Sequence, residues 1–227
     1  DMVEFTVTGS QTDVGTSDNT FTYLFTKGIA NNYEIHLVFG KLTVKETLST
    51  IVVTANSATK LYDGTALTEK GFTYTGTLAD TDRLVVEIEG SITDVLYDNN
   101  EVSSVKNHVV SVKVMRGDVD VTENYSFGTH IDGELKVTPR NVLISDFNEK
   151  VYDGTALEDK HVEVLGDGFV NDSDASWTVT GSQTDVGSSK NTFTYTLKDS
   201  VKGNYVVTKY ESTFKSAEKI IEKLASA

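Results

Sequence analysis

The chain has 227 residues, no cysteine, one proline, and 34 acidic against 20 basic side chains, which gives a net charge of −14. The absence of cysteine excludes disulfide frameworks and thiolate metal sites. The negative charge disfavours binding to nucleic acid and to anionic lipid, because both would repel the chain. No apolar run approaches the roughly 20 residues that cross a bilayer, so we expect no membrane insertion.

β-Branched residues are unusually frequent and favour strands over helices. The chain holds 31 Thr, 29 Val and 9 Ile, and such side chains fit the pleated surface of a sheet. Several segments alternate apolar and polar residues, as a strand with one buried face does. In chain order these segments cover residues 3–7, 21–25, 110–114, 177–179 and 193–197. The pattern predicts an all-β chain.

The C-terminal segment SAEKIIEKLASA, residues 216–227, departs from this pattern. Ala217, Ile220, Ile221 and Leu224 recur at helical spacing and would share one face. We therefore expect a short helical tail or linker at residues 216–227.

Internal repeats organise the rest of the chain. Residues 7–23 and 179–195 differ at only two of 17 positions, and a degenerate middle copy lies at residues 88–104. The segment K-x-Y-D-G-T-A-L occurs at residues 60–67 and 150–157. Asn-Tyr occurs at 32–33, 124–125 and 204–205, and a closing G-x-L-x-V at 40–44 and 133–137. One repeating unit therefore accounts for nearly the whole chain.

The repeats predict four segments. Residues 1–46 form a partial module, the C-terminal half of a repeat; residues 47–139 and 140–215 form two further β modules; residues 216–227 form the tail. We call the first three the first, middle and last copies. Short junctions favour tandem β-sandwich-like modules placed end to end. β-grasp-like modules are the alternative, although they need a helix that no copy offers.

The partial first copy predicts unsatisfied strand edges. A half-module leaves backbone groups unpaired, so we expect strand pairing or a swap with another chain, or local disorder. We also expect the chain to be a fragment of a longer array.

The Y-D-G-T segments are interpreted as turns. Asp bonds nearby backbone amides and Gly accepts a positive φ, whatever each copy binds. The alternative is a Tyr/Asp ligand contact repeated along the array. The residues of this structural motif are Tyr62, Asp63, Gly64, Tyr152, Asp153 and Gly154.

No motif predicts a catalytic, cofactor or metal site. The four histidines are scattered, no G-x-S-x-G elbow is present, and near-duplicated modules argue against a unique active cleft. Carboxylate pairs for glycoside hydrolysis and a Lys–Asn crosslink remain open alternatives. If calcium binds, its candidate ligands are the carboxylates of Asp167, Asp172 and Asp174, which do not follow EF-hand spacing.

The combination of K-x-Y-D-G-T-A-L, V-T-G-S-Q-T-D-V-G, Asn-Tyr and G-x-L-x-V resembles the MBG/YDG repeats of large bacterial surface proteins. The resemblance spans residues 1 to about 215. It implies tandem β-rich modules of an adhesin-like protein located outside the cell, at the cell wall or cell surface. The middle copy departs from it with GSITDVL at 90–96, and the last copy ends in ESTFKS in place of G-x-L-x-V.

These observations favour a non-catalytic structural or stalk region of a secreted or surface-anchored bacterial protein, itself adhesive in some contexts. The alternative is an adhesin module that binds a host glycan or protein through exposed aromatics such as Tyr97 or Tyr210. A third reading is an accessory region of a large extracellular enzyme.

Overall fold

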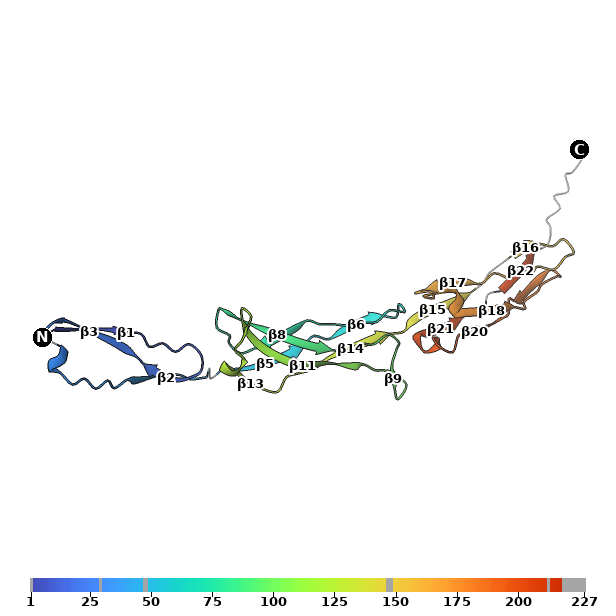
Figure 1. Ribbon diagram of the computed structural model, residues 1–227. Helices are drawn as coiled ribbons and strands as arrows, with labels where there is room; N and C mark the ends of the chain where they lie inside the picture. Colours follow the sequence, from blue (N-terminus) through green and yellow to red (C-terminus); the bar gives the residue numbers. More distant parts are fainter. Residues whose placement is uncertain (1, 29, 47–48, 146–148, 212, 218–227) are drawn as a thin grey trace, which may run out of the picture. The chain divides into compact units, whose positions relative to one another are not determined.

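The computed structural model describes residues 2–28, 30–46, 49–145, 149–211 and 213–217 (Figure 1). Strands account for 53% of the residues and helices for 5%, so the predicted all-β fold is confirmed. The helices are short 3₁₀ turns, and the described ranges hold no α-helix of the kind that a β-grasp arrangement needs. Within the same ranges, no helix has the length and apolar character to cross a membrane.

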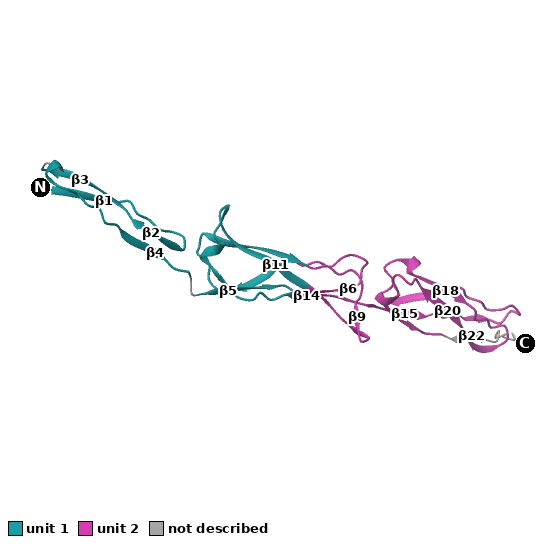
Figure 2. Cartoon of the chain, turned by 60° about the horizontal axis from the view of Figure 1, so that its bottom comes forward, with its two compact units in different colours: residues 1–56, 70–89, 107–133 teal, residues 57–69, 90–106, 134–227 magenta. Residues whose placement is uncertain are grey.

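The contacts within the chain divide it into two compact units (Figure 2). Unit 1 comprises residues 1–56, 70–89 and 107–133, and unit 2 comprises residues 57–69, 90–106 and 134–227. Each unit therefore combines segments from more than one repeat copy. The predicted module boundaries are not tested by this division and stay a prediction.

The first copy, in unit 1, consists of two separate strand pairs. The alternation of apolar residues seen in the sequence places Phe5 opposite Tyr23 and Val7 opposite Phe21. Both pairs are antiparallel: β1 (Met2–Val7) with β3 (Phe21–Lys27), and β2 (Gly15–Asn19) with β4 (Gly40–Val44), while η1 covers Ala30–Asn32.

The rest of unit 1 is organised around β5 (Thr50–Ala55). Its alternating side chains Ile51 and Val53 are fully buried and pack with Val114 and Val121. β5 pairs with β7 (Phe72–Thr75) and, in parallel, with β13 (Ser126–Phe127). The other strands and the turn are β8 (Asp82–Glu89), which pairs with β11 (Val105–Arg116), β12 (Val119–Asp120), which also pairs with β11, and η2 (Thr122–Asn124).

In unit 2, β15 (Arg140–Ser145) takes the position that β5 has in unit 1. Val142 and Ile144 are buried and pack with Phe193 and Tyr205. β15 lies between the antiparallel β17 (Glu163–Gly166) and the parallel β21 (Tyr205–Lys209). Beside them are the pair β18 (Ala175–Val179) and β20 (Phe193–Leu197), with the turns η3 (Asp172–Asp174) and η4 (Lys202–Asn204).

The remaining strands complete one sheet and form two further ones. β6 (Ala58–Leu61) runs parallel to β14 (Gly133–Thr138), which adjoins β11 in a five-stranded sheet with β12 and β8. β9 (Tyr97–Asp98) forms a hairpin with β10 (Glu101–Val102). The other sheet has the order β16 (Glu149–Val151), β22 (Thr213–Ala217), β19 (Gly187–Lys190).

The closing segment of the last copy forms a regular strand. Although ESTFKS lacks the G-x-L-x-V pattern, β22 covers most of it and pairs with strands on both sides. Ser216 and Ala217 belong to β22, so the tail that the sequence places at 216–227 begins inside a strand. Residues 218–227, where the helix was expected, lie outside the described residues.

Candidate functional site

The Y-D-G-T segments form the same hydrogen-bonded turn in both copies that carry them. Asp63 Oδ1 accepts bonds from the Thr65 amide at 2.9 Å, the Thr65 hydroxyl at 2.8 Å and Lys60 Nζ at 2.6 Å. Gly64 has a φ of +78°, a conformation that glycine adopts without strain. These bonds, led by that from Lys60, lower the pKa of Asp63 to about 2.

The second turn repeats these contacts with Asp153 and Thr155. The amide and hydroxyl of Thr155 donate to Asp153 Oδ1 at 2.9 and 2.8 Å. Gly154 has a φ of +82°. The turn is therefore set by its own sequence rather than by the surroundings of each copy.

The two turns differ in what their tyrosines contact. Tyr62 is 5% exposed and its ring meets that of Tyr205 edge-on, with centroids 5.7 Å apart. Tyr152 is 42% exposed. The Tyr205 hydroxyl donates to Asp174 Oδ2 at 2.6 Å, and burial followed by this bond raises the pKa of Tyr205 to about 12. A tyrosine of the middle copy thus packs into the core of unit 2 against a tyrosine of the last copy.

Next to these rings, Asn204 joins the middle and last copies through two hydrogen bonds. Its Oδ1 accepts from the Val95 amide at 2.7 Å, and its Nδ2 donates to Asp94 Oδ1 at 2.8 Å. Asn204 is 3% exposed. We call this pair of bonds the Asn clamp.

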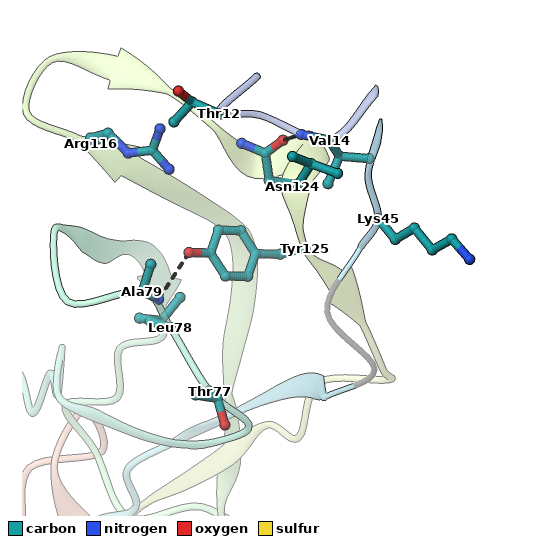
Figure 3. Close-up of a pocket in the computed structure, with 10 residues that line it drawn as sticks. Thr12, Val14, Lys45, Thr77, Leu78, Ala79, Arg116, Asn124 and Tyr125 are labelled. Atoms are coloured by element: carbon teal, nitrogen blue, oxygen red, sulfur yellow. Dashed lines mark hydrogen bonds between the residues drawn. The ribbon is translucent and has the colours of Figure 1, made fainter. Parts of the chain in front are cut away.

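An equivalent Asn clamp joins the first and middle copies in unit 1 (Figure 3). Asn124 Oδ1 accepts from the Val14 amide at 2.7 Å, and Asn124 Nδ2 donates to Asp13 Oδ1 at 2.8 Å. Arg116 Nη1 also donates to Asp13 Oδ1, at 2.9 Å. The Asp-Val of one copy and the Asn of the following Asn-Tyr are therefore partners at two places in the chain, with matching distances.

The tyrosine after each clamp asparagine is anchored by a buried carboxylate. Tyr125 donates its hydroxyl to Asp82 Oδ2 at 2.7 Å and accepts the Ala79 amide at 3.1 Å. The side chain of Asp82 has no exposed surface. Its Oδ1 also accepts a hydrogen bond from Arg116 Nε at 2.8 Å, and its Oδ2 accepts one from Arg116 Nη2 at 3.0 Å. The bonds from Arg116, followed by that from Tyr125, hold the pKa of Asp82 well below its usual range. Burial and the bond to Asp82 raise the pKa of Tyr125.

A cavity of about 320 Å³ lies beside the clamp of unit 1, along the ring of Tyr125 (Figure 3). Segments of the first and middle copies line it. The lining residues are Thr12, Val14, Val44, Lys45, Thr77, Leu78, Ala79, Arg116, Asn124 and Tyr125.

The Asp-Val pair of the last copy and the Asn of the first copy's Asn-Tyr motif form no Asn clamp within the described residues. Asp185 and Val186 of the last copy have the loop structure of Asp13 and Val14: Gln183 Nε2 donates to the Asp185 carbonyl at 2.7 Å, as Gln11 Nε2 does to that of Asp13. Val186 is nevertheless 47% exposed, and Asn32 of the first copy is also exposed.

The calcium candidates do not converge in the structure. Asp174 is buried and bonds Tyr205 and the Asn171 amide, whereas Asp167 Oδ2 accepts the Asn141 amide at 2.7 Å. Asp172 is exposed in η3. No group of three or more His, Cys, Asp or Glu side chains able to hold a metal ion occurs in the part of the chain that the structure describes. Calcium binding stays an untested prediction.

The sequence does not reveal the clamp, although both of its halves recur in it. Within any one copy, nothing links the Asp-Val of V-T-G-S-Q-T-D-V-G to the Asn-Tyr motif. The partners lie 109–111 residues apart, which places them in successive copies. The recurrence of an acidic residue in one motif and an amide in the other was the available signal.

Comparison with protein-family models, with curated proteins and with solved structures finds no match to this chain. The clamps and the cavity therefore have to be interpreted from their own chemistry.

The asparagines of the Asn-Tyr motifs allow a clamp residue, Asn204, to be compared with an exposed counterpart outside any clamp, Asn32. We expect Asn204→Ala to lower the free energy of unfolding of unit 2 by about 1–3 kcal/mol, because the Val95 amide and Asp94 lose their partner. Asn32→Ala should change it by less than about 0.5 kcal/mol. Urea unfolding followed by the fluorescence of Trp177, the one tryptophan in the sequence, measures both. Equal effects of the two substitutions would contradict a structural role for the clamp.

Asp82→Asn should change the acid dependence of unit 1. At pH 7 we expect a loss of about 2 kcal/mol, because a charged acceptor for Arg116 and Tyr125 is removed. The folded pKa of Asp82 lies below its unfolded value of about 3.9, so its contribution is present above that value and is lost as the pH falls. The difference between wild type and variant should therefore shrink below about pH 4.

Urea titrations followed by the NMR signals of β8 and β11 measure this difference. The exposed neighbour Asp80 is the control, and Asp80→Asn should behave as wild type throughout. A stability difference for Asp82→Asn that stays constant from pH 7 to pH 2 would show that the carboxylate charge is not involved.

Proposed function

We propose that this chain is a non-catalytic structural repeat region of a bacterial surface or secreted protein, in which Asn clamps fix successive modules in a stiff array. The observation that carries the proposal is the repetition of the clamp. The Val14 amide donates to Asn124 Oδ1 and the Val95 amide donates to Asn204 Oδ1, each at 2.7 Å. A contact that uses the repeat's own motifs can be added with each further copy.

The surroundings of the clamp support stiffness rather than a loose tether. At the clamp of unit 2, the buried Tyr62 adds an aromatic contact, and Arg140 donates Nη1 to the Tyr62 carbonyl at 3.1 Å. At the clamp of unit 1, Arg116 binds both Asp13 and the buried Asp82. A junction with apolar packing and several directed bonds resists bending more than a linker does.

A location outside the cell is part of the proposal. It is supported by the resemblance of the combined motifs to MBG/YDG repeats and by a composition free of cysteine, which needs no oxidative folding. A net charge of −14 would keep such an array soluble and self-repelling.

Small-angle X-ray scattering of the wild-type chain and of the double variant Asn124→Ala/Asn204→Ala tests the array. We expect the wild-type profile to fit one stiff conformation and the variant profile to need a broader set of conformations with a smaller mean radius of gyration. Asn32→Ala is the control and should match wild type. A wild-type profile as broad as that of the double variant would contradict the proposal.

Adhesion is a second candidate function, favoured by the exposure of Tyr97 and Tyr210. Tyr97 lies in the β9–β10 hairpin, whose turn residues Asn99 and Asn100 have positive φ. Exposed tyrosines offer flat apolar surface for a sugar ring or a protein side chain. On a glycan array we expect binding that Tyr97→Ala or Tyr210→Ala weakens. The absence of binding to every printed sugar would count against the carbohydrate form of this function.

A further inference from the structure

One bond in the ladder along β5 is made by a histidine ring in place of the backbone. The Val53 amide donates to His130 Nδ1 at 3.2 Å. The neighbouring bonds are ordinary backbone bonds. The Gly128 amide donates to the Ile51 carbonyl at 3.0 Å, and the Ile131 amide donates to the Val53 carbonyl at 2.9 Å. An imidazole nitrogen therefore occupies the place of a main-chain acceptor.

An extra residue beyond β13 creates this place. β13 ends with Phe127 opposite Ile51, and pairing resumes with Ile131 opposite Thr54. Three residues of this segment thus lie opposite two residues of β5. In the last copy, β21 pairs with β15 through five successive residues without such a break. A bulge leaves one residue unpaired and interrupts the ladder, and the ring of His130 restores the missing acceptor.

The surroundings hold the ring over the Val53 amide. Phe127 meets the ring of His130 edge-on, with centroids 6.0 Å apart and planes at 76°. At Gly128 a Cβ would lie 2.8 Å from Val52 Cγ2, so the glycine lets the segment approach β5 closely. Val53 is fully buried. Its amide is therefore screened from water and depends on the ring for an acceptor.

The bond between Val53 and His130 exists only while the ring is neutral. A nitrogen that accepts a hydrogen bond carries no proton, so the ring holds its proton on Nε2. Protonation of Nδ1 would set its N–H against the N–H of Val53. A buried donor would then lose its acceptor, which costs stability.

Few ionisable groups lie near this ring. β5 and β13 hold none, and β7, on the other edge of β5, holds only Tyr74. Asp132, two residues after His130, accepts the Val109 amide at 2.9 Å through Oδ1 and lies 2.9 Å from His108 Nδ1 through Oδ2. A carboxylate favours protonation of a nearby imidazole. Acid would therefore strengthen the contact of His108 with Asp132 and break that of His130 with Val53.

We propose that His130 is a pH switch in the ladder between β5 and the segment after β13. At neutral pH the ring completes the ladder. As the pH falls from about 7 to about 5, the range in which histidine takes up a proton, the Val53 bond is lost and residues 128–131 detach from β5. Because Val53 packs with Val114 and Val121, the middle copy loosens in acid. The unbroken ladder between β15 and β21 does not respond.

Hydrogen exchange followed by NMR tests the switch inside one molecule. Ile144 of β15 is as fully buried as Val53 and is the internal control. Between about pH 7.5 and about pH 5.5, after correction for the intrinsic exchange rate, we expect the protection of the Val53 amide to fall by about tenfold or more. The protection of the Ile144 amide should change by less than about twofold.

Two substitutions assign the response to one ring. His130→Asn keeps an acceptor close to the position of Nδ1 but does not titrate, so its Val53 amide should stay protected at both pH values. His108→Asn removes the other histidine near this segment and should respond as wild type does. Equal losses of protection at Val53 in wild type and in His130→Asn would overturn the proposal, as would equal losses at Val53 and Ile144 in wild type.

The nitrogen chemical shifts of the His130 ring give a readout that needs no variant. At about pH 7.5 we expect Nδ1 without a proton and Nε2 with one, and we expect Nδ1 to become protonated by about pH 5. A proton on Nδ1 at neutral pH, or a ring that stays neutral at pH 5, would also overturn the proposal. The inference goes beyond the proposed array, and its failure would leave the Asn clamps and their scattering test at neutral pH unaffected.

Discussion

An asparagine side chain that donates and accepts at the same moment holds successive copies of this repeat together. A buried amide group is costly unless both its oxygen and its nitrogen are bonded. Asn204 meets this condition with the Val95 amide and the Asp94 carboxylate, both from the middle copy. The amide lies in the last copy and both of its partners lie in the middle copy, so burial of the amide requires the two copies to be in register.

The tyrosine that follows each clamp asparagine adds a buried contact to the same junction between copies. Tyr205 is fixed by Asp174 and by the Val170 amide, at 2.6 and 3.0 Å. Tyr125 has the same two kinds of partner in Asp82 and Ala79. Because the hydroxyl is already satisfied inside its own copy, the ring face is left for the neighbouring copy. The Asn-Tyr dipeptide therefore contributes both to packing within its own repeat copy and to the contact with the preceding copy.

The sequence predicted the fold better than the site, for physical reasons. Alternation along residues 3–7 and 193–197 follows from local geometry, and the turns at Asp63 and Asp153 are closed by residues two positions away. The clamp depends on pairs of residues more than 100 positions apart, which no local pattern encodes. The burial of Tyr62 and the exposure of Tyr152 cannot be distinguished locally either, since both follow the same motif.

Residues 2–28 and 31–46 carry the V-T-G-S-Q-T-D-V-G and Asn-Tyr motifs, yet most of their side chains are exposed. The alternation of Phe5 and Val7 predicts strand β1 correctly, but it does not indicate whether a second layer covers that strand. Periodicity reports which side chains share a face; the contacts of that face depend on distant segments. The Asn-Tyr and Asp-Val motifs have the same limit, because a motif encodes one half of a contact only.

Pro139 alone separates β14, which ends at Thr138, from β15, which begins at Arg140. Tension applied along the chain would pass from one strand directly into the next, with no slack loop to absorb it. Each of these strands has a parallel neighbour, β6 and β21, so the load would fall on many backbone bonds in shear at once. The short connection thus makes the backbone a continuous tensile path, in which rupture needs several bonds to break together.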